Sequence, residues 1–131
     1  MAYLDIVTAL ALIQFVVFGF KVGSAREKYG VKAPAITGHE IFERHFRVHH
    51  NTLESLIVFL PGLYLYGHYW NPLWAAGLGV VYLIGREIYG ATYVRDPKKR
   101  SAGYGLTFLP MVILVLGGLV GAIWHLVGGR G

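Results

Sequence analysis

Four apolar stretches alternate with polar connections along the chain of 131 residues. The first covers about residues 2–20, which is close to the roughly 20 residues that a helix needs to cross a bilayer. The other three cover about residues 56–66, 73–94 and 104–127. The first connection is broken by Gly23, Gly30, Pro34 and Gly38. The pattern predicts an all-α membrane protein, a bundle of four transmembrane helices forming a single domain over residues 1–131.

The second apolar stretch is too short to cross a membrane alone. Its helix must therefore begin earlier, and Thr37 or His39 is the expected start. The helix then passes through residues 43–55, ERHFRVHHNTLES, which are crowded with polar groups. A membrane helix with so many polar groups needs a reason for them.

A cleaved signal peptide is the alternative interpretation of the first stretch. A signal peptide carries positive charge before its apolar core. Here the first Lys or Arg is Lys21, which follows the stretch. We therefore expect a retained transmembrane helix.

Composition and charge support a membrane location. The chain is 55% hydrophobic, more than a soluble domain of this size readily buries. It contains no cysteine, which excludes disulfides and a cysteine nucleophile. Basic residues fill the first and third connections but not the second. By the positive-inside rule, both basic connections lie inside and both chain ends outside, in a bacterial inner membrane or the endoplasmic reticulum.

The polar groups of the second and third helices share one side of each helix. On the second helix this side carries Arg44, Arg47, Asn51 and Glu54. On the third helix it carries Tyr82, Arg86, Tyr89 and Tyr93. At about 100° per residue, the two groups span arcs of roughly 80° and 60°. Polar sides of membrane helices face protein or water rather than lipid, so we expect these two to form a polar seam.

Glu54 and Arg86 are the two charges deepest within the apolar stretches. An unpaired charge at the bilayer centre costs at least about 2.5–3.5 kcal/mol. We therefore expect an ion pair between Glu54 and Arg86, with Glu87 as the alternative partner of Arg86.

The seam has two interpretations, a structural network between helices or a site for a small polar ligand. Its surplus positive charge, its Asn and its Tyr groups favour an anionic ligand. A metal site is a further alternative, because His45 and His49 have a usable spacing, but no third ligand is obvious. We expect His50 and His68 at the membrane interface. Close packing between helices is expected at Gly77, Gly79, Gly85, Gly117, Gly118 and Gly121.

Two motifs resemble those of a known family of membrane proteins. Residues 43–55, ERHFRVHHNTLES, are similar to a second-helix motif, approximately E-R-x-x-R-A-x-x-N-x-x-E. Residues 85–94, GREIYGATYV, and the following KKRSAG are similar to the third-helix and loop motif of the same family. This family is the membrane-associated proteins in eicosanoid and glutathione metabolism (MAPEG). The resemblance extends from SAREKYG to the last helix and is greatest to the branch of the third microsomal glutathione transferase type and leukotriene C synthase.

The resemblance implies a homotrimer of four-helix subunits with glutathione bound at each subunit interface. It implies Arg100 as the catalytic residue that activates the glutathione thiol, and Arg26 as a contact from the neighbouring subunit. The other implied binding residues are Arg47, His49, Asn51, Glu54, Arg86, Tyr89 and Tyr93. Leukotriene C synthase has an arginine and a tyrosine where this chain has Glu27 and Ser55.

The resemblance implies a membrane glutathione transferase, a glutathione-dependent lipid hydroperoxide reductase (peroxidase), or an enzyme with both activities. Either activity would serve detoxification. A thiolate formed near Arg100 would attack a hydrophobic electrophile that arrives from the bilayer, and neither a metal nor nucleic acid takes part. One alternative is a non-enzymatic fatty-acid-binding protein of the same fold. The other is a membrane scaffold or transporter in which the seam is structural.

Overall fold

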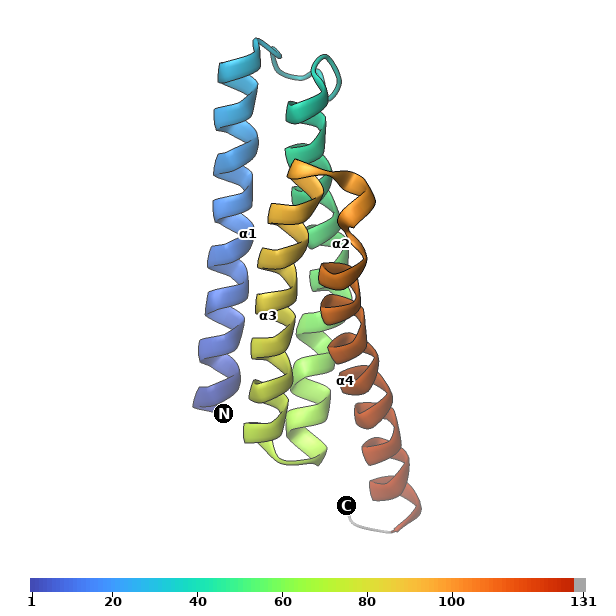
Figure 1. Cartoon of the computed structure of the whole chain (residues 1–131). Coiled ribbons are helices and arrows are strands. Elements are labelled where there is room, and N and C mark those ends of the chain that lie inside the picture. The colour runs from blue at the N-terminus through green and yellow to red at the C-terminus, as the bar shows by residue number, and fades with distance from the viewer. Residues whose placement is uncertain (129–131) are drawn as a thin grey trace.

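Four long helices lie side by side in the computed structural model, which describes residues 1–128 (Figure 1). They are α1 (Ala2–Tyr29), α2 (Glu40–Tyr69), α3 (Pro72–Arg95) and α4 (Ser101–Val127), and a short 3₁₀ helix, η1 (Pro97–Lys99), precedes α4. The predicted all-α, four-helix architecture is confirmed. The last three residues of the expected domain, 129–131, lie outside the described part of the chain.

Helix α1 is longer than the sequence pattern predicts. It continues past the apolar stretch to Tyr29, and Gly23 lies inside it rather than breaking it. Gly30 ends the helix in the left-handed conformation (φ 69°), which glycine adopts without steric cost. Part of the expected polar connection therefore extends the bundle.

The next two helices begin at identifiable caps. Nδ1 of His39 accepts a hydrogen bond from the N–H of Ile41 at 3.1 Å, so of the two expected starts of α2 it is His39 that caps the helix. The side chain of Asn71 accepts from the N–H of Leu73 at 2.8 Å and starts α3 directly after α2. The tight turn between α2 and α3 makes them antiparallel neighbours.

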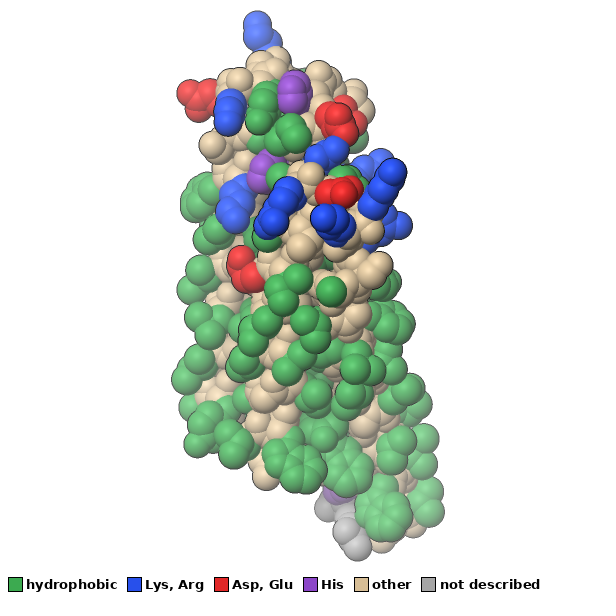
Figure 2. All heavy atoms as spheres, viewed as in Figure 1, with side chains coloured by type: hydrophobic (Ala, Val, Ile, Leu, Met, Phe, Trp, Pro, Cys, Tyr) green, Lys and Arg blue, Asp and Glu red, His purple; other side chains and the backbone are tan. Residues whose placement is uncertain are grey.

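Both basic connections lie at one end of the bundle, and the α2–α3 turn lies at the other, beside the start of α1 (Figure 1). Figure 2 shows Lys and Arg gathered at the first end, next to a wide apolar surface. Large side chains on this surface are strongly exposed, for example Phe20 (72%) and Ile57 (69%). Such a surface suits lipid rather than water. Helices α1 and α4 are long and apolar enough to cross a membrane.

Glycines allow α3 and α4 to pack closely. A Cβ on Gly85 would lie 2.7 Å from the carbonyl carbon of Leu106, and one on Gly103 would overlap the backbone of Tyr89. The prediction of close packing is confirmed at five glycines, where a Cβ would meet a neighbour at 2.5–2.7 Å: Gly79, Gly85, Gly117, Gly118 and Gly121. It is wrong at Gly77, which faces open space.

Candidate functional site

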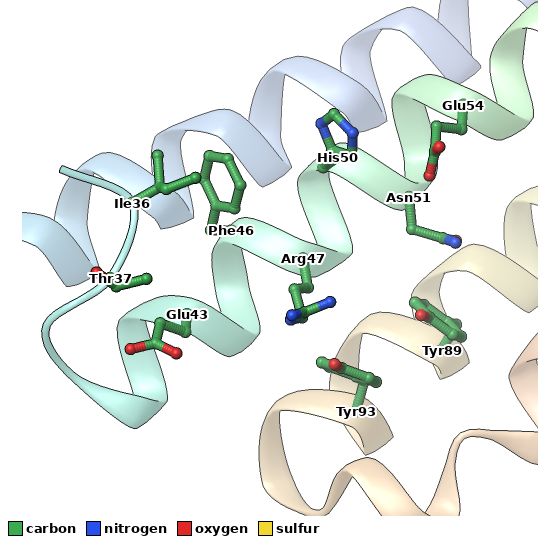
Figure 3. A pocket seen from close by; sticks show the side chains of 10 residues that line it. All are labelled: Ile36, Thr37, Glu43, Phe46, Arg47, His50, Asn51, Glu54, Tyr89 and Tyr93. Atoms are coloured by element: carbon green, nitrogen blue, oxygen red, sulfur yellow. The ribbon is translucent and has the colours of Figure 1, made fainter. Parts of the chain in front are cut away.

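A cavity of about 290 Å³ lies between α2, α3 and the α1–α2 connection (Figure 3). Its lining consists of Ile36, Thr37, Glu43, Phe46, Arg47, His50, Asn51, Glu54, Tyr89 and Tyr93. Arg47 and Asn51 point from α2 toward Tyr89 and Tyr93 on α3 (Figure 3). The structure therefore brings together five of the residues expected to bind a ligand, the fifth being Glu54.

Two further hollows continue from this cavity along the bundle. One, of about 280 Å³, shares Asn51 and Glu54 with the cavity and reaches α4 at Phe108 and Met111. The next, also of about 280 Å³, shares Phe108 and Met111 and is lined only by apolar residues of α2 and α4. The path therefore changes from polar to apolar as it leaves the basic end.

Arg86 is fully buried between the helices and binds Asn51. Its Nη1 and Nη2 donate to Oδ1 of Asn51 at 2.8 and 2.9 Å, and its guanidinium lies 4.4 Å from the ring centre of Tyr89. This geometry combines a two-nitrogen contact with a cation–π contact.

The predicted ion pair between Glu54 and Arg86 is wrong. Arg86 hydrogen-bonds Asn51 and Ser55 instead, and the alternative partner Glu87 accepts from Nε2 of Gln14 at 3.1 Å. In the described part of the chain, the one ion pair is between Arg44 and Glu40. The physical reason is register, because α3 places Arg86 level with Asn51 and leaves the exposed Glu54 side chain at the cavity.

The contact with Arg86 determines what Asn51 offers to the cavity. Both terminal nitrogens of the Arg86 guanidinium donate, so the side-chain atom that they contact must be the amide oxygen. The NH₂ group of Asn51 is then the end available to a ligand. Asn51 therefore presents a hydrogen-bond donor beside the positive charge of Arg47.

Ser55, which the sequence marked only as a difference from leukotriene C synthase, is a structural part of the site. Its Oγ lies 2.6 Å from the hydroxyl of Tyr82 and accepts from Nη1 of Arg86 at 3.4 Å. Tyr82 stacks on Phe59 with a centroid distance of 3.8 Å. The available signal was helical spacing, since Ser55 lies four residues after Asn51 and so on the same side of α2.

Arg26 and His49 do not line the cavity of their own chain. Arg26 donates to the carbonyl of Ala35 at 2.7 Å and lies over the ring of Phe42. His49 stacks on Phe15 of α1 with a centroid distance of 4.3 Å. The histidine that does line the cavity is its neighbour His50. Among residues 1–128, no group of three or more His, Asp or Glu side chains is placed to hold a metal ion.

Two further arginines, Arg44 of the seam and Arg100 of the third connection, differ in role. Arg44 donates to the carbonyls of Val94 and Arg95, at 2.9 and 3.3 Å, and so caps the end of α3. Arg100 is exposed at the start of α4, where its Nη1 donates to the carbonyl of Pro97 at 3.1 Å. Arg100 is outside the cavity lining, at the end of the connection that leads from α3 to α4.

The fold and the cavity define a small helical membrane bundle with a polar site between its helices. The chain belongs to the MAPEG family, whose sequence profile matches residues 4–120, and the resemblance seen in the motifs is thereby confirmed. It is 39% identical to microsomal glutathione S-transferase 2 of Homo sapiens, over 88% of this chain and 78% of that protein. It is 32% identical to leukotriene C4 synthase of Bos taurus (95% and 83%) and 48% identical to an uncharacterized protein of Synechocystis (92% and 88%).

Proposed function

We propose that this protein is an integral membrane glutathione transferase that binds glutathione in the cavity between α2 and α3. The observation that carries the proposal is the meeting of Arg47, Asn51 and Glu54 in one cavity. Glutathione has two carboxylates and one ammonium group. Arg47 and the amide of Asn51 donate to carboxylates, and Glu54 accepts from the ammonium. The phenols of Tyr89 and Tyr93 supply further hydrogen bonds.

Arg100 is the proposed activator of the thiol. A nearby cation lowers the pKa of a thiol and so raises the fraction of reactive thiolate. The thiol proton passes to water, and the sulfur forms a bond to an electrophilic carbon whose leaving group departs with its electron pair. With a lipid hydroperoxide, the thiolate would instead attack the terminal oxygen, so that the O–O bond breaks and the sulfenic acid of glutathione forms, while the lipid alkoxide takes a proton from water and leaves as an alcohol. A second glutathione would then convert the sulfenic acid to a disulfide and water.

The hydrophobic substrate is proposed to enter through the apolar hollow between α2 and α4. This hollow is lined by residues such as Val58 and Val115 and shares Phe108 and Met111 with the middle hollow, which leads to the polar cavity. An electrophile dissolved in the bilayer would reach the sulfur without crossing water.

We further propose a homotrimer of four-span, single-domain subunits, as the family resemblance implies. Arg26 and His49 lie away from the cavity of their own chain, so they would contact glutathione only from a second subunit. Both are on the side of the subunit formed by α1 and the adjoining face of α2. If Arg26 of one subunit met Arg47 of the next, the two positive charges would favour an anion between them.

The experiment is calorimetric titration of the detergent-purified protein with glutathione, together with conjugation of an activated aryl halide. Wild type should bind and turn over, and Arg47→Ala should lose both. Arg95→Ala is the matched control, because Arg95 is exposed at the end of α3 and outside the cavity. If wild type binds a fatty acid but no glutathione, the apolar hollow carries the second candidate function, which is non-enzymatic lipid binding.

A further inference from the structure

Ser55 is the junction of a buried hydrogen-bond chain between α2 and α3. Its Oγ donates to the carbonyl of Thr52 at 2.8 Å and lies 2.6 Å from the hydroxyl of Tyr82. Nη1 of Arg86 reaches the same oxygen at 3.4 Å. A hydroxyl has one proton and two lone pairs. Because the proton goes to Thr52, Tyr82 and Arg86 both donate to Ser55, and its hydrogen-bonding capacity is filled.

Arg86 transmits this arrangement to Asn51. The guanidinium is planar, so its position is set by Ser55 on one side and by the ring of Tyr89, 4.4 Å away. Both of its terminal nitrogens then converge on Oδ1 of Asn51. Asn51 lines the polar cavity and Arg86 does not, so in that cavity Arg86 acts on a ligand through Asn51.

We propose that Ser55 and Tyr82 are positioning residues that hold Arg86, and thereby Asn51, so that this subsite selects a carboxylate. The inference rests on the proposed function and concerns how the same cavity recognises glutathione. Within the described chain no carboxylate pairs with Arg86, so its charge adds to the donor amide of Asn51. An amide turned the other way would offer oxygen, which repels a carboxylate and accepts from an uncharged amide.

The test uses Ser55→Thr and Ser55→Val as a matched pair. Threonine and valine have nearly the same shape, and only threonine keeps the hydroxyl. The ligands are glutathione and two analogues, each with one of its two carboxylates converted to a primary amide. Calorimetry gives the Kd of each ligand, and thermal unfolding in detergent reports whether each variant is folded.

Wild type and Ser55→Thr should bind glutathione about tenfold or more tighter than one of the two amides, as expected for a charge-assisted hydrogen bond. In Ser55→Val the ratio of the Kd of the same amide to the Kd of glutathione should fall below about threefold, because Arg86 no longer fixes the orientation of Asn51. Tyr82→Phe removes a donor to Ser55 without adding volume and should lower the ratio in the same direction. Tyr82→Phe therefore replaces Ser55→Val in the test if Ser55→Val does not fold.

The possible failures are distinguishable. If wild type does not bind glutathione, the proposed function and this inference both fall. If wild type binds glutathione but Ser55→Val and Tyr82→Phe keep its selectivity, only the inference is overturned. Equal loss in Ser55→Thr and Ser55→Val also overturns it, because the hydroxyl would then not be the cause.

Discussion

Arg86 on α3 donates through both terminal nitrogens to the side-chain oxygen of Asn51 on α2, at 2.8 and 2.9 Å. The arginine is fully buried, and its partners there are uncharged. Removing a charge from water costs several kcal/mol, which hydrogen bonds and the ring of Tyr89 offset only in part. An anion bound at Asn51 would offset more of this cost, so ligand binding and bundle stability should be coupled.

Replacing Arg86 by lysine tests the two-nitrogen contact. Lysine keeps the charge but cannot donate from two fixed positions to one oxygen. We expect Arg86→Lys to weaken glutathione binding by about tenfold or more, measured as Kd by calorimetry. Arg95→Lys, at an exposed position on the same helix, is the control and should bind as wild type does. Unchanged glutathione binding by Arg86→Lys would show that the two-nitrogen contact with Asn51 is not needed.

Gly85→Ala tests the close contact between α3 and α4. The new Cβ would meet the backbone of Leu106 and Thr107 at 2.7–2.8 Å, and backbone cannot move aside cheaply. We expect a loss of about 1–3 kcal/mol in the free energy of unfolding, seen as a lower midpoint in a detergent denaturation series. Gly105→Ala is the control, because its Cβ has no neighbour within 4 Å and a helical alanine should stabilise by up to about 1 kcal/mol. Similar midpoints for the two variants would contradict the packing seen here.

Mixed oligomers test whether Arg26 serves the cavity of another subunit. Arg26→Ala and Arg47→Ala should each be inactive in conjugation alone. If the site is shared, each mixed trimer has one interface of three at which two intact halves meet, so the mixed species should show about a third of wild-type activity. Co-expression with two different tags, followed by double-tag purification, supplies the mixed species. Mixed oligomers as inactive as either parent would show that Arg26 and Arg47 do not form a shared site.

The helix number and the lining of the cavity could be predicted because hydrophobic periodicity fixes which residues share a side. Arg47, Asn51 and Tyr89 meet as the helical angles indicate. The length of α1 could not, because its last turns are mostly polar and bury only two apolar residues, Val22 and Ala25, which is too short a pattern to predict a helix. Gly23 is tolerated there since an exposed glycine weakens a helix without ending it.

The partner of Arg86 could not be predicted either, for a different reason. Helical angles give the direction of a side chain but not its height relative to a neighbouring helix. Glu54 and Asn51 share a direction and differ by about one turn in height, so either could have faced Arg86. The α2–α3 turn sets that height, and it places Arg86 beside Asn51 and Ser55. His49 and His50 differ instead by about 100° in direction, and His50 is the one at the cavity.

The most direct test of the central claim is an ultraviolet titration of the detergent-purified protein with glutathione, which follows thiolate absorbance. Wild type should show a saturating thiolate band that Arg100→Ala greatly weakens, because a nearby cation lowers the pKa of the thiol. Lys98→Ala removes one positive charge from the same exposed connection and should leave the band intact. An equal band in wild type and Arg100→Ala would contradict the assignment of Arg100 as activator. No glutathione binding by wild type would contradict the transferase itself.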